Sequence, residues 1–530
     1  MKKLWVVVFF LAGLTAMRSQ IDAWIYLHDK PDAEYYLNHP SEMLSKRALD
    51  RRMRYGIDLD IRDVPIDSAY YNMIYHSPGI HIKGHSKWLN AIHVQGDSTD
   101  IASLLTYTFI DSIVLADKRV LSKVDTNPVV YSSRKLAARR IDYGNDTMAY
   151  VMHHAFAVHE AGLTGKNILI AVIDAGFPTA DTSRVLRHIY RRDGVIDTYN
   201  FPDRTNHVYT RHPHGTMVWS LIGGLEEGEL IGTAYEADFC LYISEDVSME
   251  MPVEETYWVM AAERADSVGV DLINTSLGYI DFDNPKYNHT WEELDGKTAF
   301  ASRGAQIATE KGIHVVVSAG NAGNIPWKKI SVPADAKDVI AVGAADAFKN
   351  RASFSSTGNT SDGRIKPDVM SWGVRVKTFY AGHYWAVSGT SAAAPIITGF
   401  VADMVQHYPF LPPVEMKNYL LQSSDRFHSP DSLYGYGFPD FTLMMKNLDS
   451  LKDNQVGALR VYPNPFSNEI KVSGMIAPME YSLFDINGKM IHNGQLYPVT
   501  SWTGLKRGIY LLLIYNERKK RIIKLIKQPE

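Results

Sequence analysis

The feature that most constrains the fold is an alternation of short apolar runs and longer helical stretches between residues 146 and 445. The apolar runs are rich in Val and Ile and cover residues 168–173, 239–243, 272–277, 314–319 and 339–342. Helical stretches lie between several of them, for example at 253–267 and 297–311. Apolar strands that alternate with helices are typical of a mainly parallel sheet with helices on both faces. We therefore predict an α/β fold whose functional site lies at the carboxyl ends of the strands.

Three polar side chains stand where such a sheet would place a site. Asp174 ends an apolar strand, His214 precedes an apolar helix, and Ser391 opens the helix that continues over 396–407. A serine hydroxyl is a weak nucleophile, so it needs a base, and the base needs an orienting group. Each residue alone has an ordinary explanation, as a turn aspartate, a structural histidine or a helix-capping serine. The histidines that compete for the role of base are His188, His207 and His212.

Two further segments offer hydrogen-bond donors for a reacting carbonyl. Asn321 follows the strand 314–319, where its amide can point into the crevice, although turn asparagines are common. Residues 271–278 form a strand that ends in small residues, and exposed backbone there can pair with an extended peptide.

These motifs, taken in order, resemble those of the subtilisin-like serine proteases. They are DAG at 174–176, HGT at 214–216, SLG at 276–278, AGN at 319–321 and GTSAAAP at 389–395. The resemblance covers about 300 residues, and the order Asp, His, Ser is that of the family. It implies that Ser391 is the nucleophile, His214 the proton carrier, Asp174 the orienting carboxylate and Asn321 an oxyanion-hole donor. The residues that it places along the substrate are Ser276, Leu277 and Gly278.

Two positions depart from the family pattern. Ala175 stands where Ser or Thr is frequent, and Met217 stands where a second histidine is common. Neither position supplies a catalytic atom. The stretches 246–256 and 281–296 have the composition of loops around the cleft, and they leave the cleavage specificity open.

The N-terminus has the pattern of a signal peptide at residues 1–19. Two lysines precede the apolar stretch 4–14, and small or polar residues follow. The cut would follow Ala16 or Ser19. The alternative is an N-terminal membrane anchor, although the apolar stretch is short for a membrane span.

Residues 20–118 mix short strand-like runs with a helical stretch at 40–55, which predicts a separate α+β domain. The polar and basic segment 119–145 follows it and predicts an exposed linker. The family resemblance implies that the first segment is a prodomain that assists folding and inhibits the cleft, and that the second is its processing linker. The alternative is a permanent accessory domain.

The C-terminal part contains alternating apolar strands over residues 458–530, after a linker at 446–457. Their spacing predicts a small β-sandwich. The motifs VYPNPF at 461–466, DINGK at 485–489, RGIY at 507–510 and IKLIK at 523–527 resemble the C-terminal sorting domain of the type IX secretion system. The resemblance implies that this machinery is a partner, and that the protein crosses the outer membrane before release or surface attachment.

Composition excludes some classes of function. The chain has Lys+Arg 55 against Asp+Glu 59, so no strong positive field favours nucleic acid. Cys240 is the single cysteine, so no intramolecular disulfide forms, and its apolar neighbours predict a buried packing role. Hydrolysis needs no cofactor. The resemblance allows structural calcium, but no acidic cluster in the sequence assigns a metal site.

The sequence thus predicts an exported serine endopeptidase with an α/β catalytic domain at 146–445, acting on protein or peptide substrates through an acyl-enzyme. Two alternatives remain open. An inactive surface-binding protein would keep the fold and lose the chemistry, and an intact triad with Asn321 argues against it. A dedicated processing protease with one partner would differ only in its specificity.

Overall fold

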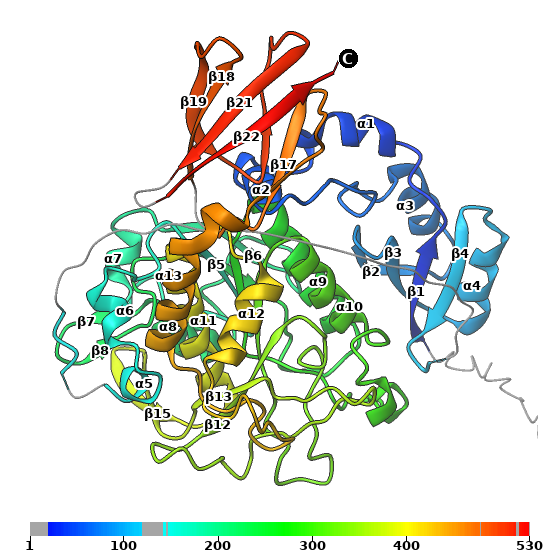
Figure 1. The fold of residues 1–530 in the computed structure, drawn as a ribbon. Coiled ribbons are helices and arrows are strands. Elements are labelled where there is room, and N and C mark those ends of the chain that lie inside the picture. Colours follow the sequence, from blue (N-terminus) through cyan, green and yellow to red (C-terminus); the bar gives the residue numbers. More distant parts are fainter. Residues whose placement is uncertain (1–19, 119–140, 145–146, 477–478, 516–518, 529–530) are drawn as a thin grey trace, which may run out of the picture.

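A computed structural model describes residues 20–118, 141–144, 147–476, 479–515 and 519–528. The predicted signal peptide, and the predicted linker apart from residues 141–144, lie outside these ranges. Three units follow one another along the chain, an N-terminal domain, a central domain and a C-terminal domain (Figure 1). Within the described ranges, no helix combines the length and the apolar character that a membrane span requires.

The central domain contains a parallel sheet of seven strands in the order β13-β12-β11-β10-β5-β9-β6. Its strands are β5 (Leu169–Asp174), β6 (Val195–Asn200), β9 (Asp238–Ile243), β10 (Leu272–Thr275), β11 (His314–Ser318), β12 (Ile340–Ala345) and β13 (Val369–Trp372). All five strands predicted from apolar runs are present, and the predicted α/β class is confirmed. The two strands at the edges, β6 and β13, were not predicted.

Helices cover both faces of this sheet. They include α8 (His214–Gly223), α9 (Val253–Val268), α10 (Phe300–Glu310) and α11 (Thr390–His407). Alternate residues of β5 enter two different cores, Ile170 and Val172 with α8 and α11, Ala171 and Ile173 with α9 and α10. Cys240 in β9 is fully buried, and burial raises the pKa of its thiol to about 12, which fits a packing role.

Further elements complete the central domain. They are α5 (Met148–Met152), α6 (Phe156–Glu160), α7 (Arg187–Tyr190), β7 (Leu225–Glu226), β8 (Leu230–Ile231), β14 (Val376–Tyr380), β15 (His383–Val387), α12 (Pro413–Gln422) and α13 (Phe441–Ala458), with 3-10 turns at Pro285–Tyr287 and Trp291–Glu293. The stretch 446–457, predicted as a linker, lies inside α13. Asp440 caps this helix through its side chain, which accepts a hydrogen bond from the Leu443 amide.

The N-terminal domain is a four-stranded antiparallel sheet with helices, in the strand order β2-β3-β1-β4. Its elements are β1 (Ile21–Leu27), α1 (Ala33–Asn38), α2 (Lys46–Tyr55), α3 (Ser68–Tyr75), β2 (His81–Ser86), β3 (Ala91–Gly96), α4 (Ser98–Ser103) and β4 (Ile110–Leu115), with 3-10 turns at Pro40–Glu42 and Leu104–Thr106. Ala23 and Ile25 on one face of β1 pack in this domain's own core. Trp24 on the opposite face joins the core around α9 and α10.

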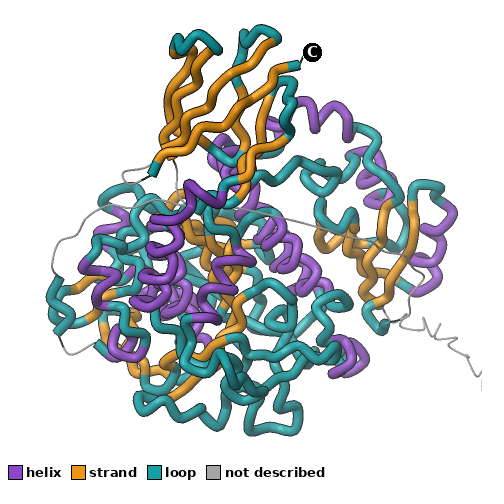
Figure 2. The backbone as a smooth tube through the Cα atoms, in the orientation of Figure 1, coloured by secondary structure: helices purple, strands orange, loops and turns teal. Residues whose placement is uncertain are grey.

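The C-terminal domain consists of strands and loops, as Figure 2 shows. One sheet has the order β16-β17-β20 and the other β19-β18-β21-β22, with a shared apolar core. The strands are β16 (Arg460–Tyr462), β17 (Glu469–Ser473), β18 (Met479–Asp485), β19 (Met490–Leu496), β20 (Val499–Ser501), β21 (Gly508–Tyr515) and β22 (Lys520–Lys527). This is the predicted β-sandwich.

Candidate active site

Asp174 is the last residue of β5, near the centre of the parallel sheet. Its side chain is fully buried at the carboxyl end of the strand. Oδ1 accepts hydrogen bonds from the Ala175 amide at 2.7 Å and lies 2.7 Å from His214 Nδ1. The carboxylate is therefore fixed in place and directed at one imidazole.

His214 is the first residue of α8, and Gly215 allows this helix to approach β5. A Cβ on Gly215 would lie 2.5 Å from the Gly176 carbonyl oxygen and 2.9 Å from Asp174 Cβ. Thr216 Oγ1 donates a hydrogen bond to the Pro178 carbonyl at 2.9 Å, which also holds the first turn of α8 in place. The sequence HGT thus brings the imidazole against the carboxylate because its middle residue has no side chain.

The surroundings of His214 favour its protonated form. Burial alone would lower the pKa of His214, but the charge of Asp174 and the hydrogen bond to it outweigh burial, and the pKa is raised. Glu245, which follows β9, adds a smaller contribution in the same direction. An imidazole that accepts a proton more readily beside a carboxylate is suited to act as a general base.

Ser391 lies in the first turn of α11, four residues before Pro395. Because Pro395 has no amide hydrogen, the Ser391 carbonyl lacks the hydrogen-bond partner that it would have in a regular helix. Ser276 Oγ donates to that carbonyl at 3.1 Å in its place. Asn274 Nδ2 donates in turn to Ser276 Oγ at 3.3 Å. The strand β10 is thereby joined to the helix that carries the serine.

Asn321 faces Ser391 across a small space beside Gly389. The position that a Cβ on Gly389 would occupy lies 2.8 Å from Ser391 Oγ and 3.6 Å from Asn321 Nδ2. Asn321 Oδ1 accepts from the Thr390 amide at 2.9 Å and from Thr390 Oγ1 at 3.1 Å. These two donors fix the orientation of the amide, so Nδ2 is the group presented to the space beside the serine.

Ser331 is a residue at this site that the sequence motifs did not indicate. Its amide donates to the Ala319 carbonyl at 3.1 Å, and the next residue pairs with Tyr279. A Cβ on Gly278 would overlap Ser331 Oγ, and a Cβ on Gly320 would lie 3.0 Å from it. The Ser331 hydroxyl is buried and has no hydrogen-bond partner among the described residues. Ser331 therefore fills the space between the two chain segments that flank Ser391, one containing Gly278 and the other Gly320.

The structure separates the competing histidines. His214 is paired with Asp174, whereas His188 Nε2 contacts the Tyr235 carbonyl at 2.7 Å. His207 is exposed. His212 is also exposed, and its ring centre lies 6.3 Å from that of His214. The predicted site residues lie together at the carboxyl ends of the parallel strands, where the sequence predicts a site. They are Asp174, His214, Ser391, Asn321 and Ser276.

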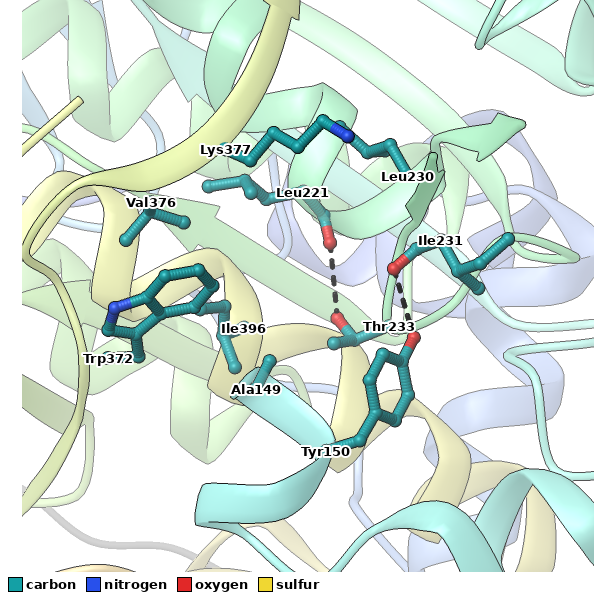
Figure 3. Close-up of a pocket in the computed structure, with 10 residues that line it drawn as sticks. All are labelled: Ala149, Tyr150, Leu221, Leu230, Ile231, Thr233, Trp372, Val376, Lys377 and Ile396. Atoms are coloured by element: carbon teal, nitrogen blue, oxygen red, sulfur yellow. Dashed lines mark hydrogen bonds between the residues drawn. The ribbon is translucent and has the colours of Figure 1, made fainter. Parts of the chain in front are cut away.

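A cavity of about 20 Å³ lies elsewhere in the central domain, between α5, α8, β8, β14 and α11 (Figure 3). Ala149, Leu221, Trp372 and Ile396 are among its lining residues, and none of the predicted catalytic residues lines it. Its size suits one water molecule. Within the described ranges, no three His, Cys, Asp or Glu side chains are placed to hold a metal ion, and calcium binding stays a prediction.

Comparison with protein families assigns all three units. Residues 165–437 match the subtilase family, residues 22–130 match the Bacteroidota propeptide domain of peptidase S8, and residues 460–528 match the secretion system C-terminal sorting domain. The chain belongs to the subtilase family. It combines a subtilase domain with a propeptide domain and a C-terminal sorting domain.

Individual relatives agree with this assignment. Subtilisin DY of Bacillus licheniformis is 31% identical over 283 residues, which cover 53% of this chain and 90% of the relative. Human membrane-bound transcription factor site-1 protease is 29% identical over 311 residues, which cover 55% of this chain and only 26% of that longer protein. The structure of the epidermin leader peptide processing serine protease from Staphylococcus aureus covers 81% of this chain, with a TM-score of 0.53 and 18% identity. At that identity the likeness concerns the fold.

Proposed function

We propose that the protein hydrolyses peptide bonds through a triad of Asp174, His214 and Ser391 and an acyl-enzyme intermediate. The observation that carries the proposal is the 2.7 Å pair of Asp174 and His214 at the strand edge where Ser391 and Asn321 flank one small space. His214 takes the proton of the Ser391 hydroxyl as the oxygen attacks the scissile carbonyl, and returns it to the leaving amine. Asp174 holds the imidazole and stabilises its cation.

Asn321 supports the same reaction as an oxyanion donor. As the carbonyl becomes tetrahedral, its oxygen gains negative charge and needs donors that are already in position. Asn321 Nδ2 is held in place because Oδ1 is engaged by Thr390. The Ser391 amide, in the first turn of α11, is the second donor. Water then hydrolyses the ester by the same proton path in reverse.

The substrate is proposed to lie extended beside Ser276, Leu277 and Gly278. Gly278 is exposed and Leu277 half-buried, so the segment presents backbone to the solvent. A peptide side chain that enters between Gly278 and Gly320 meets Ser331, which leaves room for a small group only. We infer a preference for small residues before the scissile bond.

Export and control are proposed from the flanking domains. The sorting domain supports passage through the type IX machinery to the cell surface or the medium, after an N-terminal signal directs export. The propeptide domain is proposed to inhibit the enzyme until the segment 119–145 is cut. No cofactor enters the chemistry.

The test is labelling with a fluorophosphonate probe, which reacts with activated serines. The wild-type protein and Ser391→Ala are compared after the propeptide domain has been digested away. Labelling of the wild type alone would support the triad. A folded, processed wild type that stays unlabelled would exclude the enzyme and favour an inactive binding protein.

A further inference from the structure

One face of the larger sheet in the sorting domain is uncovered. The sheet has the strand order β19-β18-β21-β22, and Figure 1 shows it at the opposite end of the molecule from β12 and β13. Successive side chains of a strand point to opposite faces of its sheet. Tyr481 and Leu483 of β18 and Leu512 and Ile514 of β21 pack in the core of the domain. The residues that alternate with them therefore face outward.

This outward face is apolar along its centre. Ile522 and Ile526 of β22 are 65% and 37% exposed, and Met490 of β19 is 51% exposed. Several exposed apolar residues that adjoin one another mark an interaction site more often than single ones do. The cross-strand pairs that make this surface continuous are Leu513–Ile522, Ile509–Ile526, Leu511–Phe484 and Phe484–Met490.

Lysines alternate with the isoleucines along β22. Lys520, Ile522, Lys524 and Ile526 are all exposed and point to the same side, and we call these four residues the lysine face. Within the described ranges, no carboxylate pairs with Lys520 or Lys524. The outward-facing acid of these four strands is Glu480 in β18, two strands away from Lys520. The lysine face thus combines unpaired positive charge with aliphatic surface.

The charge of the whole sorting domain narrows the kind of partner. Residues 458–530 contain 11 Lys and Arg against 5 Asp and Glu, although the complete chain has 55 against 59. A second copy of the domain would bring like charges together at this face, which is unfavourable. A neutral apolar partner would bury the lysines without a counter-charge. A bilayer with anionic lipids has negative charge at its surface and apolar chains beneath, and so matches both components of the face.

We propose that the lysine face docks the protein on the surface of a bilayer that contains anionic lipids. Lys520 and Lys524 contact the head-group phosphates, and Ile522 and Ile526 reach the boundary of the acyl chains. The strand is already ordered by its pairing with β21, so binding has little ordering cost. Salt weakens such binding because it screens the lysines. The proposal concerns a surface of the sorting domain and does not depend on the triad.

The test is flotation of the full chain with lipid vesicles. The chain carries Ser391→Ala, so that it stays intact whether or not the wild type cuts itself. We expect it to float with vesicles of phosphatidylglycerol and phosphatidylcholine in equal parts, to stay behind with vesicles of phosphatidylcholine alone, and to bind less at high salt. Equal binding to both kinds of vesicle would overturn the proposal. Binding to neither would also overturn it and would favour an acidic protein as the partner.

Variants of the face give the second measurement. Lys520→Gln combined with Lys524→Gln should weaken binding to the anionic vesicles at least tenfold, since each lysine at such a surface contributes about fivefold. Ile522→Thr suits a strand but shortens the apolar contact, so it should weaken binding at both low and high salt. The matched control is Lys286→Gln combined with Lys297→Gln, which removes two exposed lysines of the catalytic domain and changes the net charge equally. Unchanged binding of the Lys520 and Lys524 variant, or an equal loss in the control, would overturn the proposal.

Discussion

At the scale of single residues, His214 is subject to opposing effects whose balance sets a pH dependence. Burial lowers its pKa, and Asp174 with the hydrogen bond raises it by more, so the pKa lies above its ordinary value of 6.5. Only neutral His214 can take the serine proton, so activity is lost as the pH falls through this raised pKa. We expect the acid limb of kcat/KM to have its midpoint above pH 6.5, measured with a peptide substrate. A midpoint well below 6.5 would contradict the assignment of His214 as base.

Glu245 allows a separate test of the same electrostatics. It is buried, its pKa is raised to about 7 by burial, and Tyr279 OH donates to it at 2.8 Å. Its charge also raises the pKa of His214. Glu245→Gln keeps the shape and removes the charge, so the acid limb should move to lower pH by a fraction of a unit. Glu227→Gln, at an exposed glutamate in the turn between β7 and β8, should leave the limb in place.

Asn321 is expected to act on turnover and not on substrate binding. Asn321→Ala should lower kcat by about 100- to 1000-fold, the usual cost of removing one oxyanion donor. KM should change little, because the donor acts mainly on the tetrahedral state. The control is Asn324→Ala, at an exposed asparagine three residues away. Wild-type turnover from folded Asn321→Ala would remove this residue from the oxyanion hole.

Ser331 is expected to set the size of the side chain accepted before the scissile bond. Its buried hydroxyl lies between Gly278 and Gly320. Ser331→Gly opens this space and should shift cleavage of a peptide library from small residues toward Leu, Met and Phe. Ser331→Ala keeps most of the volume and should retain the preference for small residues. If the wild type already cleaves after Phe as readily as after Ala, the inferred restriction is wrong.

At the scale of secondary structure, burial decided what the sequence could predict. The central strands, such as β5, are fully buried and apolar, so their composition predicted them. The edge strand β6 has the sequence VIDTYN and is partly exposed, and this polar composition gives no strand signal. The sequence likewise indicated Asp174, His214 and Ser391 through local motifs. It could not indicate Ser331, because its position between Gly278 and Gly320 depends on chain segments that meet only in the fold.

The close approach of α8 to β5 makes Gly215 a test at the same scale. Gly215→Ala would bring a methyl group within 2.5 Å of the Gly176 carbonyl oxygen, so the start of α8 must shift and carry His214 with it. A shift of about 1 Å at a catalytic group costs about 100-fold in activity, and overpacking costs about 1–3 kcal/mol of stability. Kinetics and thermal unfolding measure the two effects. Gly508→Ala, where an added Cβ meets no atom closer than 4.0 Å, is the control and should change neither.

At the scale of the whole molecule, the flanking domains are joined to the catalytic domain in different ways. Trp24 and Trp88 of the propeptide domain belong to the same apolar core as α9 and α10. The core of the sorting domain contains residues from Leu459 onward only, and among the described residues of this domain Ile476 alone belongs to the core around α8 and α11. The sequence predicted both domains from their composition. It could not predict this difference, which depends on the partners that each apolar face finds in the fold.

The difference predicts unequal effects of removing each domain. Apart from Ile476, which joins the core around α8 and α11, the sorting domain contacts the rest through a few groups. Examples are the pair Lys471–Asp58 at 3.6 Å, in which Asp58 is 87% exposed, and an edge contact of Phe410 with Tyr497. Exposed pairs contribute little and Ile476 is one small buried contact, so deletion of residues 459–530 should leave kcat/KM unchanged and lower the unfolding temperature of the catalytic domain by only a few degrees. Calorimetry of the full chain should accordingly show a separate transition that disappears with the deletion. Loss of the propeptide domain uncovers the apolar surface of α9 and α10 and leaves the buried Asp266 of α9 without its partner Arg51, so it should lower the unfolding temperature of the catalytic domain. If deletion of the sorting domain lowers this temperature as much as loss of the propeptide domain does, both flanking domains stabilise the catalytic domain equally and the expected difference is wrong.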